Sequence, residues 1–139
     1  MKKIYSFYTA FWCFLLVAAS QMVWGQETLS CPAGTIESNT MTFTTTNFTI
    51  VHAKASDTNF ASFSPWRVYT DNTVTFTGGS GVQRITSIVI TATSNAYATA
   101  ANGSVSVTSG TGSASIGVSG STVTITAIGN VKGVMIDPS

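Results

Sequence analysis

The side chains that most often perform catalysis are scarce in this chain of 139 residues. It holds one histidine, His52, five carboxylates and two cysteines, Cys13 and Cys31. A zinc site uses several His, Cys or carboxylate ligands, and His52 has no second histidine or cysteine at ligand spacing. No nucleophile elbow surrounds a serine, and no carboxylate pair suggests a glycosidase. The sequence therefore predicts a protein that is not an enzyme, with an unrecognised hydrolase as an alternative.

Oxygen-bearing side chains in loops could bind calcium, which prefers carboxylates and carbonyls. The candidates are Asp57, Asp71 and Asn72, but they lack the regular Asp-x-Asp-x-Asp spacing of a calcium loop. Asp71 and Asn72 also suit a turn, because both residue types tolerate left-handed backbone. We therefore predict no cofactor, and calcium remains the weaker alternative.

Aromatic residues with polar neighbours form the best candidate ligand site. An aromatic ring can stack on a sugar ring, while Asn, Asp and Arg side chains can hydrogen-bond its hydroxyls. The residues that combine these properties are Trp66, Arg67, Tyr69, Asp71, Asn72 and Tyr97. Trp66 has a second interpretation as the large aromatic residue of the core, since it is the only tryptophan after residue 25. Loops 53–65 and 94–102 and the surroundings of Tyr69 are expected to present the site.

The elements that would position these side chains are mostly strands. Apolar residues alternate with Thr or Ser in runs that begin about every 8–12 residues, with Gly or Ser between them. The predicted strands lie within 41–52, 66–77 and 84–93, and around Val105, Ile116, Val123 and Val131. We expect His52 at a strand end, a bulge or break near 44–47, and a short helix or wide loop at 95–102. The fold prediction is all-β, an antiparallel Ig-like or jelly-roll-like β-sandwich of about seven to nine strands.

The N-terminal region has the pattern of a secretory signal peptide. Two lysines follow Met1, an apolar stretch comes next, and Val23-Trp24-Gly25 suits cleavage before Gln26. An uncleaved anchor is the alternative, but the apolar run is shorter than the roughly 20 residues of a spanning helix. We expect a signal peptide at 1–25, a polar lead-in at 26–40 and the β-sandwich domain at 41–139. Export through the Sec pathway would place the protein in the periplasm, on the outer surface or outside the cell.

The chain is poor in charge, with six Lys and Arg residues against five Asp and Glu residues. Removal of residues 1–25 would take away Lys2 and Lys3, leaving four basic groups and a net charge of −1. Without a basic stripe, the chain is not expected to bind nucleic acid. We also predict no membrane insertion of the mature chain. Uncharged Thr- and Val-rich strands favour self-association through open strand edges.

Three segments carry motifs of one group of bacterial modules. They are Trp66 to Phe76 (WRVYTDNTVTF), Arg84 to Thr91 (RITSIVIT) and the stretch from Gly103 to Thr126. Together they resemble small β-sandwich accessory modules in secreted and surface proteins of the Bacteroidota, which lie beside lamin-tail, nuclease or glycan-active domains. The resemblance covers roughly residues 40–136 and implies a β-sandwich without catalytic residues.

These observations predict a secreted or cell-surface, non-catalytic β-sandwich module for adhesion or carbohydrate association. Its expected partner is a glycan or another surface protein. The alternative is a self-assembling structural subunit that pairs its open strand edges. The two hypotheses differ in what they require, because glycan binding needs exposed ligand-contacting side chains and self-assembly needs an unpaired strand.

Overall fold

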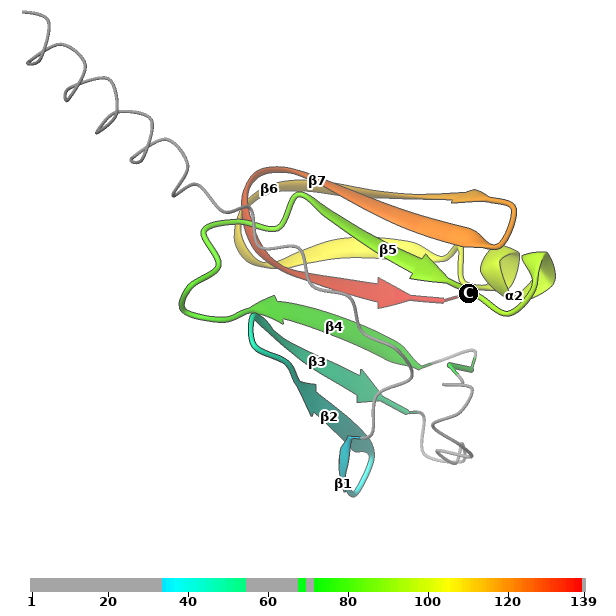
Figure 1. The fold of residues 1–139 in the computed structure, drawn as a ribbon, viewed down its shortest axis with the longest axis horizontal. Coiled ribbons are helices and arrows are strands. Elements are labelled where there is room, and N and C mark those ends of the chain that lie inside the picture. The colour runs from blue at the N-terminus through cyan, green and yellow to red at the C-terminus, as the bar shows by residue number, and fades with distance from the viewer. Residues whose placement is uncertain (1–33, 55–67, 70–71, 139) are drawn as a thin grey trace, which may run out of the picture.

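The computed structural model describes residues 34–54, 68–69 and 72–138, which form seven strands and one short helix (Figure 1). The expected signal peptide and most of the lead-in lie outside these residues. The elements are β1 (Thr35–Glu37), β2 (Thr40–Thr44), β3 (Phe48–Ala53), β4 (Thr73–Gly78), β5 (Ser87–Thr91), α2 (Asn95–Ala100), β6 (Ser104–Ser119) and β7 (Thr122–Asp137). The all-β prediction is confirmed.

All seven strands belong to one antiparallel sheet, and β7 is its centre. Strands β1, β2, β3, β4 and β7 follow one another in the sheet. The C-terminal half of β7 pairs with β4 and its N-terminal half with β5, while β6 pairs along its whole length. Figure 1 shows the sheet curling, so that β5 and the far part of the β6–β7 hairpin lie above β4. The described strands thus form one curled sheet, and its division into the two sheets of a sandwich stays a prediction.

The β6–β7 hairpin corrects the expectation of four separate strands after residue 104. Both strands have 16 residues and pair throughout, apart from register shifts at Val107/Ser109 and Ser109/Gly110. Gly110 and Gly112 on β6 have φ values of 85° and 144°, and Gly129 on β7 has φ 101°. Backbone with positive φ favours glycine. A β-bulge bends the strand pair in which it lies. The glycines that suggested strand ends therefore lie where one long hairpin bends.

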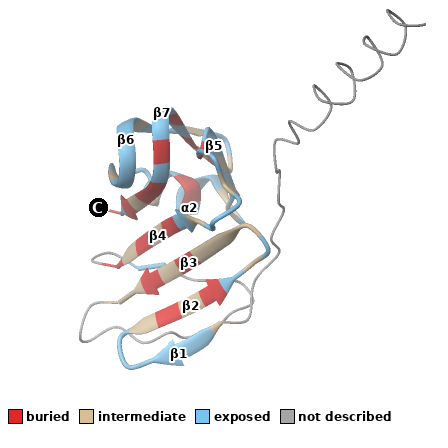
Figure 2. Cartoon of the chain, turned by 90° about the vertical axis from the view of Figure 1, so that its left-hand side faces the viewer, coloured by how far each residue is buried: buried red, intermediate tan, exposed pale blue. Residues whose placement is uncertain are grey.

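Alternation of side chains places one face of the sheet in the core. Phe43 lies opposite Ile50, Ile50 opposite Phe76, and Phe76 opposite Val134, so a single apolar row crosses four strands. The buried cluster consists of Met41, Phe43, Ile50, Val74, Phe76, Ile125, Ala127, Val131, Val134 and Ile136. Buried stripes on these strands are visible in Figure 2. A slip of one residue would turn an entire strand's apolar set outward, which fixes the register.

The opposite face of β1 to β4 carries hydroxyl groups at most positions. Thr42 on β2 lies opposite Thr35 on one side and Val51 on the other, and Val51 lies opposite Thr75. We call this surface the threonine face, formed by Thr35, Thr40, Thr42, Thr44, Thr49, Thr73, Thr75 and Thr77. Neutral hydroxyls therefore provide most of its polarity, in agreement with the low charge of the chain.

Local hydrogen bonds settle two elements that the sequence left open. The expected break near 44–47 is a tight turn, in which the Thr45 hydroxyl accepts from the Phe48 backbone N–H at 2.9 Å. Residues 95–100 form a short helix, and the Ser94 hydroxyl accepts from the Tyr97 backbone N–H at 3.3 Å as its N-cap. Among the described residues, no helix has the length and hydropathy needed to span a bilayer.

Candidate functional site

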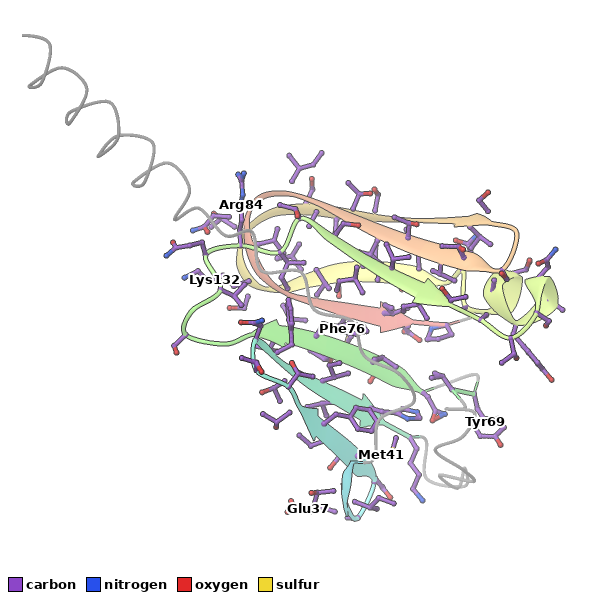
Figure 3. The ribbon with its side chains drawn as sticks, viewed as in Figure 1. Glu37, Met41, Tyr69, Phe76, Arg84 and Lys132 are labelled. Atoms are coloured by element: carbon purple, nitrogen blue, oxygen red, sulfur yellow. The ribbon has the colours of Figure 1, made fainter. Side chains whose placement is uncertain are left out.

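The structure places three of the six residues predicted to bind a ligand. Trp66, Arg67 and Asp71 lie outside the described residues. Tyr97 on α2 is 67% exposed and Tyr69 is 38% exposed. Figure 3 shows Tyr69 at the lower right of the fold, beyond the edge of the β-strands. Two exposed aromatic rings are thus available at the surface. The third described candidate, Asn72, is buried.

Asn72 is fully buried, which corrects its expected place on a ligand-binding surface. Its side-chain Oδ1 lies 3.0 Å from the Nε2 of His52, and His52 is 1% exposed. His52 lies one residue before the end of β3, opposite Met41 and Val74, and its side chain faces the core. The pair joins β3 to the start of β4 through a polar contact inside an apolar core. The Nδ2 atom of Asn72 has no hydrogen-bond partner within the described structure.

Burial also fixes the charge state of His52. Desolvation lowers its pKa below the usual 6.5, and the hydrogen bond with Asn72 opposes this shift in part. The neutral imidazole is therefore favoured in the folded state, with Nε2–H donating to Oδ1 as the tautomer that fits the observed contact. A neutral, enclosed imidazole next to an amide is a structural pair rather than an exposed catalytic base.

We expect acid to destabilise the fold through His52. The unfolded chain takes up a proton near pH 6.5, whereas the folded chain does so only at a lower pH. The contribution of His52 to the free energy of unfolding should therefore be fully present well above pH 6.5 and fall as the pH decreases through that value. Urea unfolding measured at intervals between pH 7.5 and about 5 tests this, because most carboxylates titrate lower.

The matched control is His52→Gln, which retains a polar side chain but cannot titrate. Its free energy of unfolding should be lower than that of the original chain at neutral pH, because the contact with Asn72 changes. Its dependence on pH over the same interval should be much flatter. An equally steep dependence in both proteins would assign the acid sensitivity to another group.

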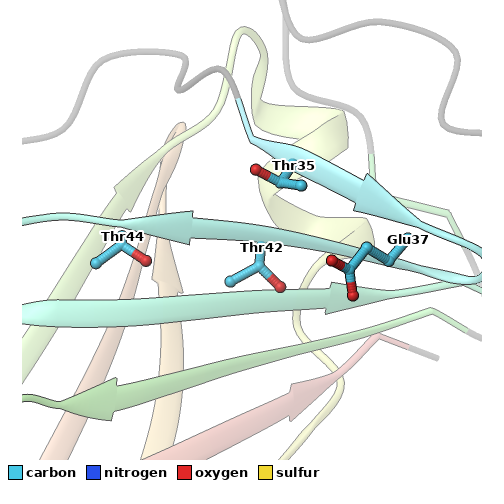
Figure 4. A pocket seen from close by; sticks show the side chains of 4 residues that line it. All are labelled: Thr35, Glu37, Thr42 and Thr44. Carbon is cyan, nitrogen blue, oxygen red and sulfur yellow. The ribbon is translucent and has the colours of Figure 1, made fainter.

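A shallow depression on the threonine face is the candidate site that the sequence did not reveal. It is lined by Thr35 and Glu37 of β1 and by Thr42 and Thr44 of β2 (Figure 4). Thr35 lies directly opposite Thr42, and Glu37 opposite Thr40, so the antiparallel register brings the lining side chains to one face. We call this depression the threonine hollow. Its only signal in the sequence is the alternation of Thr at 40, 42 and 44.

Among the described residues that line it, the threonine hollow is neutral apart from one carboxylate. Glu37 is one of five acidic residues in the whole chain, and no ion pair of Glu37 occurs within the described residues. The hydroxyls can each donate one hydrogen bond and accept others, while the ionised carboxylate accepts only. This arrangement is suited to holding a neutral ligand rich in hydroxyl groups.

A metal centre is not apparent in the described part of the chain, where no three His, Cys, Asp or Glu side chains come together. Of the calcium candidates, Asp57 and Asp71 lie outside that part and Asn72 points into the core. Comparison of the chain with protein-family models, with curated proteins and with solved structures found no match.

Proposed function

We propose that this protein is a secreted or cell-surface, non-catalytic β-sandwich module that associates with carbohydrate through the threonine hollow. The observation that supports this most directly is the grouping of three threonine hydroxyls and Glu37 at one depression of the sheet. The predicted signal peptide supports an extracytoplasmic location, where glycans are abundant. The resemblance to accessory modules found beside glycan-active domains also favours association with carbohydrate.

The chemistry of the hollow favours a neutral saccharide over a charged ligand. A saccharide offers hydroxyls that both donate and accept, which matches Thr35, Thr42 and Thr44, and its donors can reach the Glu37 carboxylate. A phosphate or sulfate group would meet Glu37 with a like charge, and no basic side chain stands among the described residues that line the hollow. The hollow is also partly open to solvent, so it leaves room for a chain of sugars to extend beyond it.

Binding to an array of neutral and acidic oligosaccharides, followed by calorimetry with the best ligand, tests the proposal. Thr42→Val removes one hydroxyl with little change of shape and should weaken binding by about 3- to 10-fold. Glu37→Gln should weaken it by about 10-fold or more, because hydrogen bonds to a charged group are stronger. Neutral saccharides should bind in preference to acidic ones.

Thr124→Val is the matched control, because Thr124 is a half-buried, outward-facing threonine on β7 that lies outside the hollow. It should leave affinity unchanged. The exposed aromatic residues provide the competing site, tested by Tyr97→Ala and Tyr69→Ala. If these two variants abolish binding while Thr42→Val and Glu37→Gln do not, the aromatic surface is the site. If no saccharide on the array binds, the carbohydrate proposal fails.

A further inference from the structure

The outer edge of β6 is a long strand edge without a partner among the described residues. β6 pairs only with β7 there, although it is 16 residues long. Figure 2 shows β6 at the side of the upper layer with no other strand beside it. An unpaired edge presents backbone N–H and C=O groups that can pair with another strand. Such edges are commonly protected by lysine, proline, short length or a β-bulge. β6 has no lysine or proline and is 16 residues long, and its register shifts lie between Val107 and Gly110, away from Ile116.

The side chains of β6 are also incompletely covered on the core side. Ala114, Ile116 and Val118 are only half-buried. Their cross-strand neighbours on β7 (Ala127, Ile125 and Val123) are 7%, 0% and 1% exposed. The apolar layer therefore continues to the edge and ends there uncovered. An added strand that places small apolar residues on the same side would complete it.

The sequence of this edge is complementary to itself. Residues 113–119 read Ser-Ala-Ser-Ile-Gly-Val-Ser, a pattern in which small polar residues or glycine alternate with apolar ones on both sides of Ile116. In an antiparallel pair of two such strands centred on Ile116, Ala114 faces Val118, Gly117 faces Ser115 and Ser113 faces Ser119. Small residues then lie opposite larger ones, and every core-facing residue meets another core-facing residue.

We propose that β6 pairs with the β6 strand of a second copy of this chain, antiparallel and centred on Ile116. The contact is isologous: a two-fold axis perpendicular to the sheet passes midway between the two Ile116 residues, so the same surface serves both copies. The apolar sides of both copies then lie on the same side of one continuous sheet. No charged residue on β6 opposes the approach. Pairing of two different edges, such as β6 with β5, would instead build an open chain of copies.

Charge substitutions at the edge test both the pairing and its register. Ser113 and Ser119 are exposed and face away from the core, so their replacement should preserve the fold. In the proposed register, position 113 of one copy faces position 119 of the other. The double variant Ser113→Lys/Ser119→Lys places like charges directly opposite each other, and Ser113→Glu/Ser119→Lys places opposite charges there.

Sedimentation equilibrium of the purified protein, up to a concentration on the order of 1 mM, should give a monomer–dimer equilibrium. The lysine–lysine variant should raise the dissociation constant at least 10-fold, and the glutamate–lysine variant should match the original chain or bind more tightly. Added salt should reduce the difference between the two variants. Circular dichroism confirms that both are folded.

Three outcomes would overturn the proposal. The original chain could remain a monomer throughout the concentration range. It could form a ladder of larger species, as expected for pairing of two different edges. The two charge variants could also dimerise equally well, which would place the contact elsewhere or in another register.

Discussion

Replacing Gly112 with alanine is expected to lower the free energy of unfolding by about 3–5 kcal/mol. Gly112 has φ 144°, a backbone conformation that side chains with a Cβ atom rarely adopt. The added Cβ would also collide with the carbonyl oxygen of Ile128, and it would lie 2.9 Å from Cγ2 of Val131. The carbonyl belongs to the backbone of the facing strand, so it cannot move aside without disturbing the bend of the hairpin.

Urea unfolding of the two proteins measures this effect, and Gly117→Ala is the control within the same strand. Gly117 has no positive φ, and a Cβ built there meets no atom within 4 Å. Alanine at 117 should be neutral or stabilise the fold by up to about 1 kcal/mol, since it restricts the unfolded chain. Equal effects at 112 and 117 would show that the bend does not depend on glycine.

Replacing Ile125 with alanine is expected to cost about 3–4 kcal/mol of stability. Ile125 is 0% exposed and lies opposite Ile88 of β5 on one side and Ile116 of β6 on the other. Truncation removes apolar contacts from the middle strand of three, and neighbours held by two ladders have little freedom to fill the cavity. The loss should therefore exceed the cost of transferring the missing methylene and methyl groups alone.

The comparison with Ile128→Ala makes this prediction specific to burial. Ile128 is three residues further along β7 but 69% exposed. Its replacement should change the unfolding free energy by less than about 0.5 kcal/mol. Chemical denaturation followed by circular dichroism provides both values. A loss at 128 comparable to that at 125 would mean that Ile128 is covered in solution, for instance by another copy of the chain.

Alternation of residue types predicted which face of each strand is buried. Met41 and Phe43 share one parity and Ile50 and His52 the other, and the structure explains the change by the turn at 45–47. Such patterns are readable because side chains alternate strictly along a strand. The bend of the β6–β7 hairpin was not readable, because a glycine with positive φ looks the same in sequence whether it ends a strand or bends it.

The candidate site also depends on pairing between strands that are separate in the sequence. The partners of the threonine hollow could not be foreseen, since the alternation at 40–44 does not say which strand lies beside it. Asn72 was misassigned for a related reason. Its polar side chain and its neighbour Asp71 favoured a surface turn, whereas the contact with His52, 20 residues away, requires it to be inside.

The central position of β7 has a consequence for the order of folding. β4 and β5 precede β7 in the chain, yet each depends on it for a ladder. During vectorial synthesis or export these two strands emerge first and remain without that partner until residues 122–137 follow. The short turn between β6 and β7 requires little loop closure, so we expect the hairpin to form early and to serve as the template on which β5 and β4 dock. β4 can already pair with β3 during this interval, whereas β5 has no ladder among the described strands until β7 arrives.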